Sequence, residues 1–167
     1  DDEQKLLLSP NSELDIVDSH YRENAASLDR AELVLQRGAL RTVSGLIARR
    51  NAEMFVVRTA HVNLGVRGTD FSVTIVGQTY WSVNEGAVVA TTNAGKGAFG
   101  KGAFGRSSSI DRLAAGVSSA GLPVAVLALF NEVNSPAVTA QLGPGPAPGG
   151  PMTAAAPSSD AAPRSSG

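Results

Sequence analysis

Apolar and polar side chains alternate through the first hundred residues, and glycines stand where the alternation breaks. The alternation is clearest over residues 58–73, where Val62, Leu64 and Val66 are separated by polar or small residues. A period of two is typical of a β-strand with one buried and one wetter face. The pattern breaks at Gly68 and then resumes, which predicts a corner or bulge at that glycine.

Similar alternation elsewhere predicts about eight short strands between residues 5 and 92, with no convincing helix among them. The segments that carry it best are residues 6–8, 14–16, 32–44, 55–57, 71–76 and 81–83. Residues 21–28 are predicted to form a loop or a single helical turn. The first half of the chain is therefore predicted to be an all-β domain.

A glycine recurs at equivalent places in two of these segments. Residues 35–42 and 83–90 share the order apolar, two variable residues, Gly, Ala, apolar, with Gly38 and Gly86 in register. Two matching glycine bends predict two equivalent corners of a coiled or stacked sheet. Gly77, in the turn that follows residue 76, is expected to adopt a positive φ.

Two stretches resemble the signature of the FecR domain family. They are RTAHVNLGVRGTDF at residues 58–71 and RGALRTVSG at residues 37–45, within a resemblance that covers roughly residues 5–105. Ala60 stands where the family usually has a proline. The resemblance implies a β-solenoid-like or twisted-sandwich domain in the bacterial periplasm. Founding members of the family sense a loaded outer-membrane transporter and pass the signal to a sigma factor.

Residues 95–105 carry a five-residue duplication, KGAFG followed by KGAFG. Its glycines also satisfy the G-x-G-x-x-G string of dinucleotide-binding folds. That site requires a strand before the string and a helix directly after it, within a βαβ unit, and this chain shows neither the helix nor the unit. The stretch is therefore predicted to be a flexible strand end, with Phe99 and Phe104 packed against the sheet.

One helix is predicted, at about residues 122–133. Pro123 suits a first helical turn, and Val126, Leu127 and Phe130 are spaced to share one face. A helix of this length is marginal alone in water, so it is expected to dock on the β domain or to remain partly unfolded.

The predicted organisation is a FecR-like β domain at residues 1–105, a linker with the helix at 106–142, and a tail at 143–167. The tail consists mainly of Pro, Ala, Gly and Ser, which cannot bury enough apolar surface to offset its ordering entropy, and it is predicted to be disordered. A FecR-type signal protein would also carry a sigma-binding segment and a membrane span. We therefore expect either a fragment of such a protein or a stand-alone exported one.

Composition excludes several classes of function. The formal net charge of −1 argues against a nucleic-acid partner, and the absence of Cys excludes disulfides and thiolate chemistry. No window has the eighteen apolar residues of a membrane span. The charges are sorted: residues 1–32 hold nine acids, whereas residues 37–67 hold six arginines and one acid. They form either two solvated faces or a cationic strip for an acidic partner or an anionic glycan.

Residues that carry chemistry are few. His61, Asp70 and Ser72 have the types of a catalytic triad, but nothing in their spacing brings them together. The only short window with metal-ligand types contains Asp15, Asp18 and His20, and acids that lead into a loop are usually solvated. We therefore predict no catalytic site, no metal and no cofactor.

Four residues remain as binding candidates: Arg67, Asp70, Tyr80 and Trp81. Arg67 either pairs with Asp70 or nearby carbonyls to fix the corner, or contacts a partner or anionic ligand. Tyr80 and Trp81, together with Tyr21, are the residues that could present flat aromatic faces to a sugar.

The favoured function is a non-catalytic, periplasmic or exported module for protein recognition and signalling in the bacterial envelope. Its partner is expected to be another envelope protein, such as an outer-membrane receptor domain, which adds a strand to an open edge of the sheet. The alternative is an envelope structural or glycan-binding protein, which exposed Tyr80 or Trp81 would favour.

Overall fold

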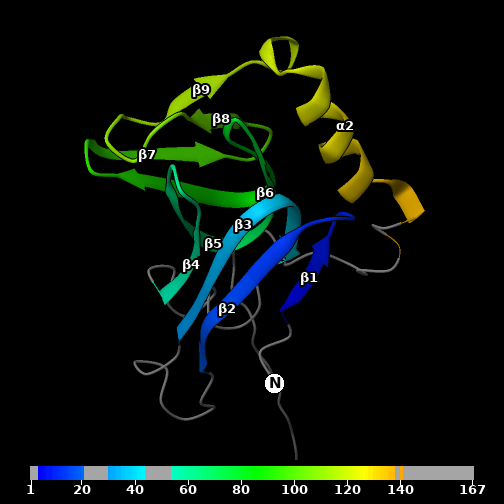
Figure 1. Cartoon of the computed structure of the whole chain (residues 1–167), viewed down its shortest axis with the longest axis horizontal. Helices are drawn as coiled ribbons and strands as arrows, with labels where there is room; N and C mark the ends of the chain where they lie inside the picture. Colours follow the sequence, from blue (N-terminus) through cyan, green and yellow to red (C-terminus); the bar gives the residue numbers. More distant parts are fainter. Residues whose placement is uncertain (1–3, 21–29, 44–53, 138–139, 141–167) are drawn as a thin grey trace, which may run out of the picture.

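The computed structural model describes residues 4–20, 30–43, 54–137 and 140. In this part of the chain nine strands form one sheet and a short helix covers part of it (Figure 1), which confirms the all-β prediction. The loop predicted at residues 21–28 and the tail predicted at 143–167 lie outside the described residues. None of the described helices is long and apolar enough to cross a membrane.

Neighbouring strands run antiparallel, except that β3 and β4 are parallel. The strands are β1 (Lys5–Leu8), β2 (Glu13–His20), β3 (Arg30–Val43), β4 (Phe55–Arg58), β5 (Asn63–Val76), β6 (Gln78–Thr92), β7 (Gly95–Gly100), β8 (Phe104–Ser107) and β9 (Ala115–Val117). They are followed by a 3-10 turn, η3 (Ser119–Gly121), and the helix α2 (Val124–Val133).

The three long strands each bend at a glycine with positive φ: Gly38 in β3, Gly68 in β5 and Gly86 in β6. The predicted corners are thereby confirmed, as is the positive φ of Gly77. About eight strands were predicted between residues 5 and 92, and six lie in the parts of this range that the structure describes. The long strands have 14 or 15 residues and continue through their bends instead of ending there.

Each long strand changes neighbours at its bend. Before Gly38, β3 pairs with β2 and β4, and after it with β1 and β5. β5 likewise pairs first with β4 and then with β3, whereas β6 pairs first with β8 and then with β7. The bends thus divide one sheet into two layers that share strands. All nine strands belong to one continuous sheet, and the choice between the two predicted architectures, β-solenoid-like and twisted sandwich, stays a prediction.

The apolar core lies between the two layers and contains side chains from both. It includes Leu33, Phe55 and Leu64 from one layer, and Phe71 and Trp81 from the other. All five are almost fully buried. The strands predicted from alternation therefore bury the side chains expected to face inward.

The KGAFG duplication forms the end of β7, a turn and the start of β8, so its glycines belong to paired strands rather than to a flexible strand end. Phe99 enters the core, where its ring meets Trp81 edge to face with centroids 5.2 Å apart. Phe104 packs instead with the cluster beneath α2. The sheet continues beyond residue 105, because β8 pairs with β9.

Gly105 allows the close approach of Trp81. A Cβ atom at this position would overlap the indole ring. We expect Gly105→Ala to destabilise the fold by about 1–3 kcal/mol through overpacking. Denaturant unfolding, followed by the fluorescence of the single tryptophan, would measure the change.

Gly100→Ala is the matched control, since no atom lies within 4 Å of the position where its Cβ would stand. Equal unfolding free energies for Gly100→Ala and Gly105→Ala would contradict the proposed contact.

Helix α2 covers the outer face of one layer, as Figure 1 shows on the right of the sheet. It confirms the helix predicted at about 122–133, and it buries Val126, Phe130 and Val133.

The predicted alternation of β5 had implied a wetter second face after Gly68. Ser72 and Thr74 on that face are nevertheless fully buried. Ser72 bonds Asn134, directly after α2, so the helix end occupies the place of solvent beside this residue.

Candidate functional site

The segment Arg67–Asp70 forms the bulge of β5. The register between β5 and β6 shifts between Arg67 and Asp70, and the Thr69 side chain closes the bulge. Its hydroxyl accepts a bond from the Arg67 amide at 3.0 Å and lies 2.8 Å from the carbonyl oxygens of both Arg67 and Ala87. The conformation of the motif is thus fixed by its own threonine and by β6.

Asp70 forms a buried ion pair with Arg41, not with Arg67 as one reading of the sequence proposed. The Arg41 Nε and Nη2 atoms donate to the two Asp70 oxygens at 2.9 and 2.7 Å. The two side chains are only 6% and 8% exposed. Arg67 is exposed, and the bulge separates it from Asp70. The pair joins the two family-like stretches, because Arg41 lies in β3 and Asp70 in β5.

The ion pair belongs to a polar network that reaches the end of α2. Asn84 of β6 donates to Asp70 at 3.2 Å and to the side-chain oxygen of Asn134 at 2.9 Å. The Asn134 amide in turn donates to Ser72 at 3.0 Å. Arg41 completes the link, since its Nη1 donates to the Val133 carbonyl at 3.4 Å. Three strands and a helix end thus meet at one cluster of polar side chains.

Neither predicted aromatic platform is available. Trp81 is fully buried in the core, and Tyr80 is 4% exposed beneath α2. The Tyr80 hydroxyl accepts a hydrogen bond from Gln78 at 2.9 Å. Tyr21 lies outside the described residues. The glycan-binding alternative therefore loses the two residues whose exposure would have favoured it.

The structure does not assemble a catalytic triad from His61, Asp70 and Ser72. The Nδ1 atom of His61 lies 2.9 Å from the Thr79 hydroxyl, whereas Asp70 and Ser72 bond Arg41 and Asn134. Thr79 donates to Thr59, so its oxygen is left to accept from His61 Nδ1–H. His61 thus belongs to a hydrogen-bonded chain of threonines.

The acids proposed as metal ligands have other partners. Asp15 accepts a bond from Gln36 at 2.9 Å, and Asp18 lies 3.5 Å from Arg30. Over the described parts of the chain, no three His, Asp or Glu side chains are grouped as a metal site would require.

Several arginines of the arginine-rich segment form ion pairs with acidic residues of the sheet. Arg37 lies 3.5 Å from Glu13, and Arg58 lies 3.3 Å from Glu32. With Arg41, three of the six arginines in the arginine-rich segment pair with acids. Two others lie outside the described residues, and Arg67 is exposed. This favours solvated, paired faces over a continuous cationic strip.

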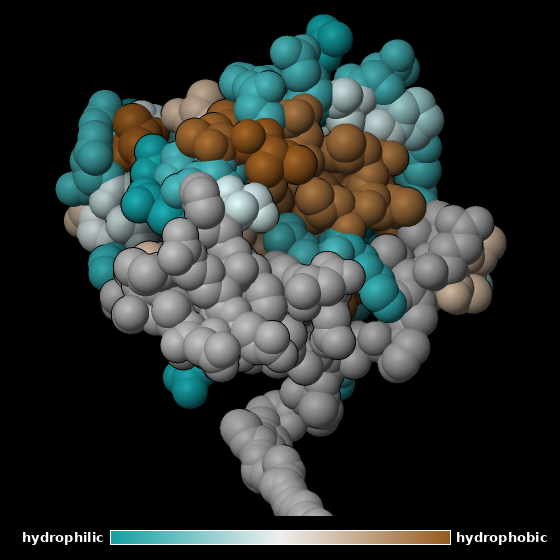
Figure 2. Space-filling view, turned by 90° about the horizontal axis from the view of Figure 1, so that it is seen from below, coloured by the Kyte–Doolittle hydropathy of each residue, from teal (hydrophilic) through white to brown (hydrophobic). Residues whose placement is uncertain are grey.

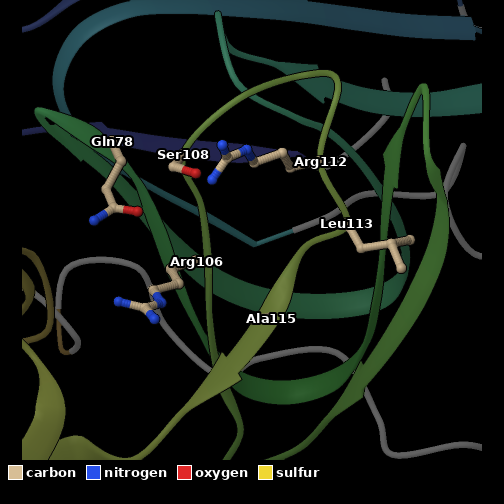
Figure 3. A pocket seen from close by; sticks show the side chains of 6 residues that line it. All are labelled: Gln78, Arg106, Ser108, Arg112, Leu113 and Ala115. Carbon is tan, nitrogen blue, oxygen red and sulfur yellow. The ribbon is translucent and has the colours of Figure 1, made fainter.

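A shallow hollow of about 360 Å³ lies beside β8, lined by Gln78, Arg106, Ser108, Arg112, Leu113 and Ala115. Figure 3 shows that the Arg106 and Arg112 side chains do not converge on one point. The hollow therefore offers no shared cradle for one small anion.

Four strands have an outer edge that is open among the described residues. β1 and β2 pair only with β3, β7 pairs only with β6, and β9 pairs only with β8. β2 is the longest of the four, with eight residues, and it exposes Ile16 (62%) and Val17 (59%). Figure 2, which views the molecule from below, also shows an apolar area bordered by polar residues. Exposed apolar groups of this kind often mark interaction sites.

These observations define an all-β domain with one bent sheet, in which a buried polar cluster joins three strands to the end of α2. The model of the family described as "FecR protein" matches residues 1–89, and the chain belongs to this family. Family membership supports a signalling or regulatory role. The match ends within β6, short of the predicted limit at residue 105.

No curated protein matches the chain. Two solved structures of candidate anti-sigma factors from Parabacteroides distasonis ATCC 8503 resemble it, at 2.50 and 1.65 Å resolution. Their sequence identities are 12% and 15%, with TM-scores of 0.47 and 0.46. The alignments cover 69% and 70% of this chain but only 60% and 56% of those chains.

Proposed function

We propose that this chain is a non-catalytic recognition module of the bacterial envelope, periplasmic or exported, which binds another envelope protein. The observation that carries the proposal is the open outer edge of β2. Membership of the FecR family supports a regulatory role for such a contact. A receptor domain of the outer membrane is the partner class that the family resemblance implies.

The geometry of β2 suits strand addition. An eight-residue strand extends over about 26 Å, and half of its backbone groups point away from its single neighbour. A partner strand would bond these groups, and alternate side chains would provide selectivity. Val17 occupies an irregularity in the pairing with β3.

The side chains of β2 favour a selective contact over self-association. Glu13, Asp15 and Asp18 flank the exposed Ile16 and Val17. Acids on an edge strand repel a second copy of the same strand, which protects against aggregation. A partner strand that carries apolar and basic residues would satisfy both features.

The test is a titration with the isolated N-terminal domain of an outer-membrane receptor. We expect the double substitution Ile16→Lys and Val17→Lys to weaken binding at least about tenfold, since it removes the apolar contacts of the edge. Folding should change little, because both side chains are exposed. Leu113→Lys, at an exposed apolar residue in the loop between β8 and β9, is the control and should bind as the unaltered chain does.

No binding by the unaltered chain at high micromolar concentration, to any receptor domain of the source organism, would overturn the proposal. Equal weakening by Leu113→Lys would place the contact elsewhere.

A further inference from the structure

Helix α2 and the face that receives it come from different parts of the chain. The polar residues that bond the end of the helix (Arg41, Ser72 and Asn84) all lie within residues 1–89, which the family model matches. The helix begins at Val124, 35 residues after the match ends. The polar half of the helix-binding face therefore lies within the matched segment, and the helix that occupies it lies outside.

The apolar half of this face has a defined shape. Val126 and Phe130, four residues apart on one side of α2, are buried together with Leu122 against Tyr80. Phe104 adds an aromatic contact, with its ring centroid 6.5 Å from that of Phe130. A helix needs apolar residues at a spacing of four to fill this part of the face.

The polar half fits the C-terminal end of a helix. The last carbonyls of a helix lack partners within it and carry a partial negative charge. Arg41 donates to the carbonyl of Val133, and Asn84 donates to the side chain of Asn134. Asp70 holds Arg41 with two hydrogen bonds that do not involve the helix. The cation is thus positioned by the sheet and needs no helix to orient it.

Few features stabilise α2 by itself. It has ten residues, its N-terminal cap Pro123 provides no side-chain hydrogen bond, and its first turn has no acid. Val124 is 83% exposed, so one side of the helix contributes no apolar burial. A helix this short is marginal in water, and its order must come from docking.

We infer that this face is a receptor for an amphipathic helix, which α2 occupies within the chain and which a helix of a partner protein binds once α2 leaves. The partner helix carries apolar residues at positions i, i+4 and i+7, and an amide side chain directly after its last turn. This surface is separate from the β2 edge, so the inference stands or fails independently of the proposed function.

The test uses the full chain and a synthetic peptide with the sequence of residues 122–135. Val126→Ala combined with Phe130→Ala in the full chain should release α2, because both buried contacts are lost. We expect the labelled peptide to bind this variant at least about tenfold more tightly than it binds the unaltered chain, where α2 competes from a tethered position. A peptide with the same two alanines should bind neither chain.

Asn134→Ala provides a milder variant that keeps the apolar contacts. It should raise peptide binding severalfold, with exchange of the α2 amides accelerated and tryptophan fluorescence unchanged. If α2 exchanges freely in either variant and the peptide still does not bind, the inference is wrong. It is equally wrong if both variants lose the native fluorescence, since α2 would then be an inseparable part of the fold.

Discussion

Replacing Asp70 with alanine is expected to lower the free energy of unfolding by about 3–5 kcal/mol, because it leaves the Arg41 guanidinium buried without its counter-ion. Arg41 keeps the carbonyl of Val133 as an acceptor, which carries no charge to balance the guanidinium, and Asn84 loses one acceptor. Urea unfolding followed by tryptophan fluorescence would measure the loss.

Glu13→Ala removes the acid of an exposed ion pair and is the control for the charge itself. Glu13 lies 3.5 Å from Arg37, and both side chains are exposed, so its removal should cost less than about 1 kcal/mol. Replacing both buried partners, Arg41→Met with Asp70→Leu, should recover much of the loss, because no buried charge then remains. A loss below about 1 kcal/mol for Asp70→Ala would contradict the role of the pair.

The partner of Asp70 could not be predicted from local spacing. Arg67 is three residues away in the chain, but the bulge at Gly68 separates the two side chains. Arg41 is 29 residues away and becomes a neighbour only because β3 pairs with β5 after the bend at Gly38. Arg41 and Asp70 each stand beside a threonine, but so does Arg58, so this position did not single out the pair.

The strands themselves were largely predictable, because the inward side chains of each layer alternate regularly. The exceptions are places where a second element covers the outer face. Ser72 and Thr74 are polar, as on a solvated face, but the first bonds Asn134 and the second donates to the Gly38 carbonyl. A buried, hydrogen-bonded hydroxyl residue cannot be distinguished in the sequence from a solvent-exposed one, because both occupy every second position of a strand.

The duplicated KGAFG shows how a repeat can mislead. Equal sequence suggested equal roles, but the two phenylalanines lie in different strands, β7 and β8, with a turn between them. Phe99 pairs with Val88 and enters the core, whereas Phe104 pairs with Ser82, on the other side of the bend at Gly86, and lies beneath α2. The repeat was visible in the sequence, but the turn that divides it between two strands was not.

The bends of the long strands lead to a second prediction with a large effect, at Gly86. Both Gly86 and Gly77 have positive φ, 79° and 72°, where an L-residue costs roughly 1–2 kcal/mol. Their surroundings differ. A Cβ atom at Gly86 would overlap the backbone carbonyls of Arg67 and Gly68, whereas no atom lies within 4 Å of one at Gly77.

Gly86→Ala should therefore cost more than Gly77→Ala by about 1–3 kcal/mol, the usual penalty of overpacking. The atoms that this Cβ would overlap belong to the main chain, which cannot rotate away as a side chain can. The bulge of β5 must therefore move to accommodate the alanine. Thermal unfolding of the two variants would measure the difference directly. Equal midpoints would mean that the bends of β5 and β6 are not in contact, and that the bulge positioning Asp70 is held by Thr69 alone.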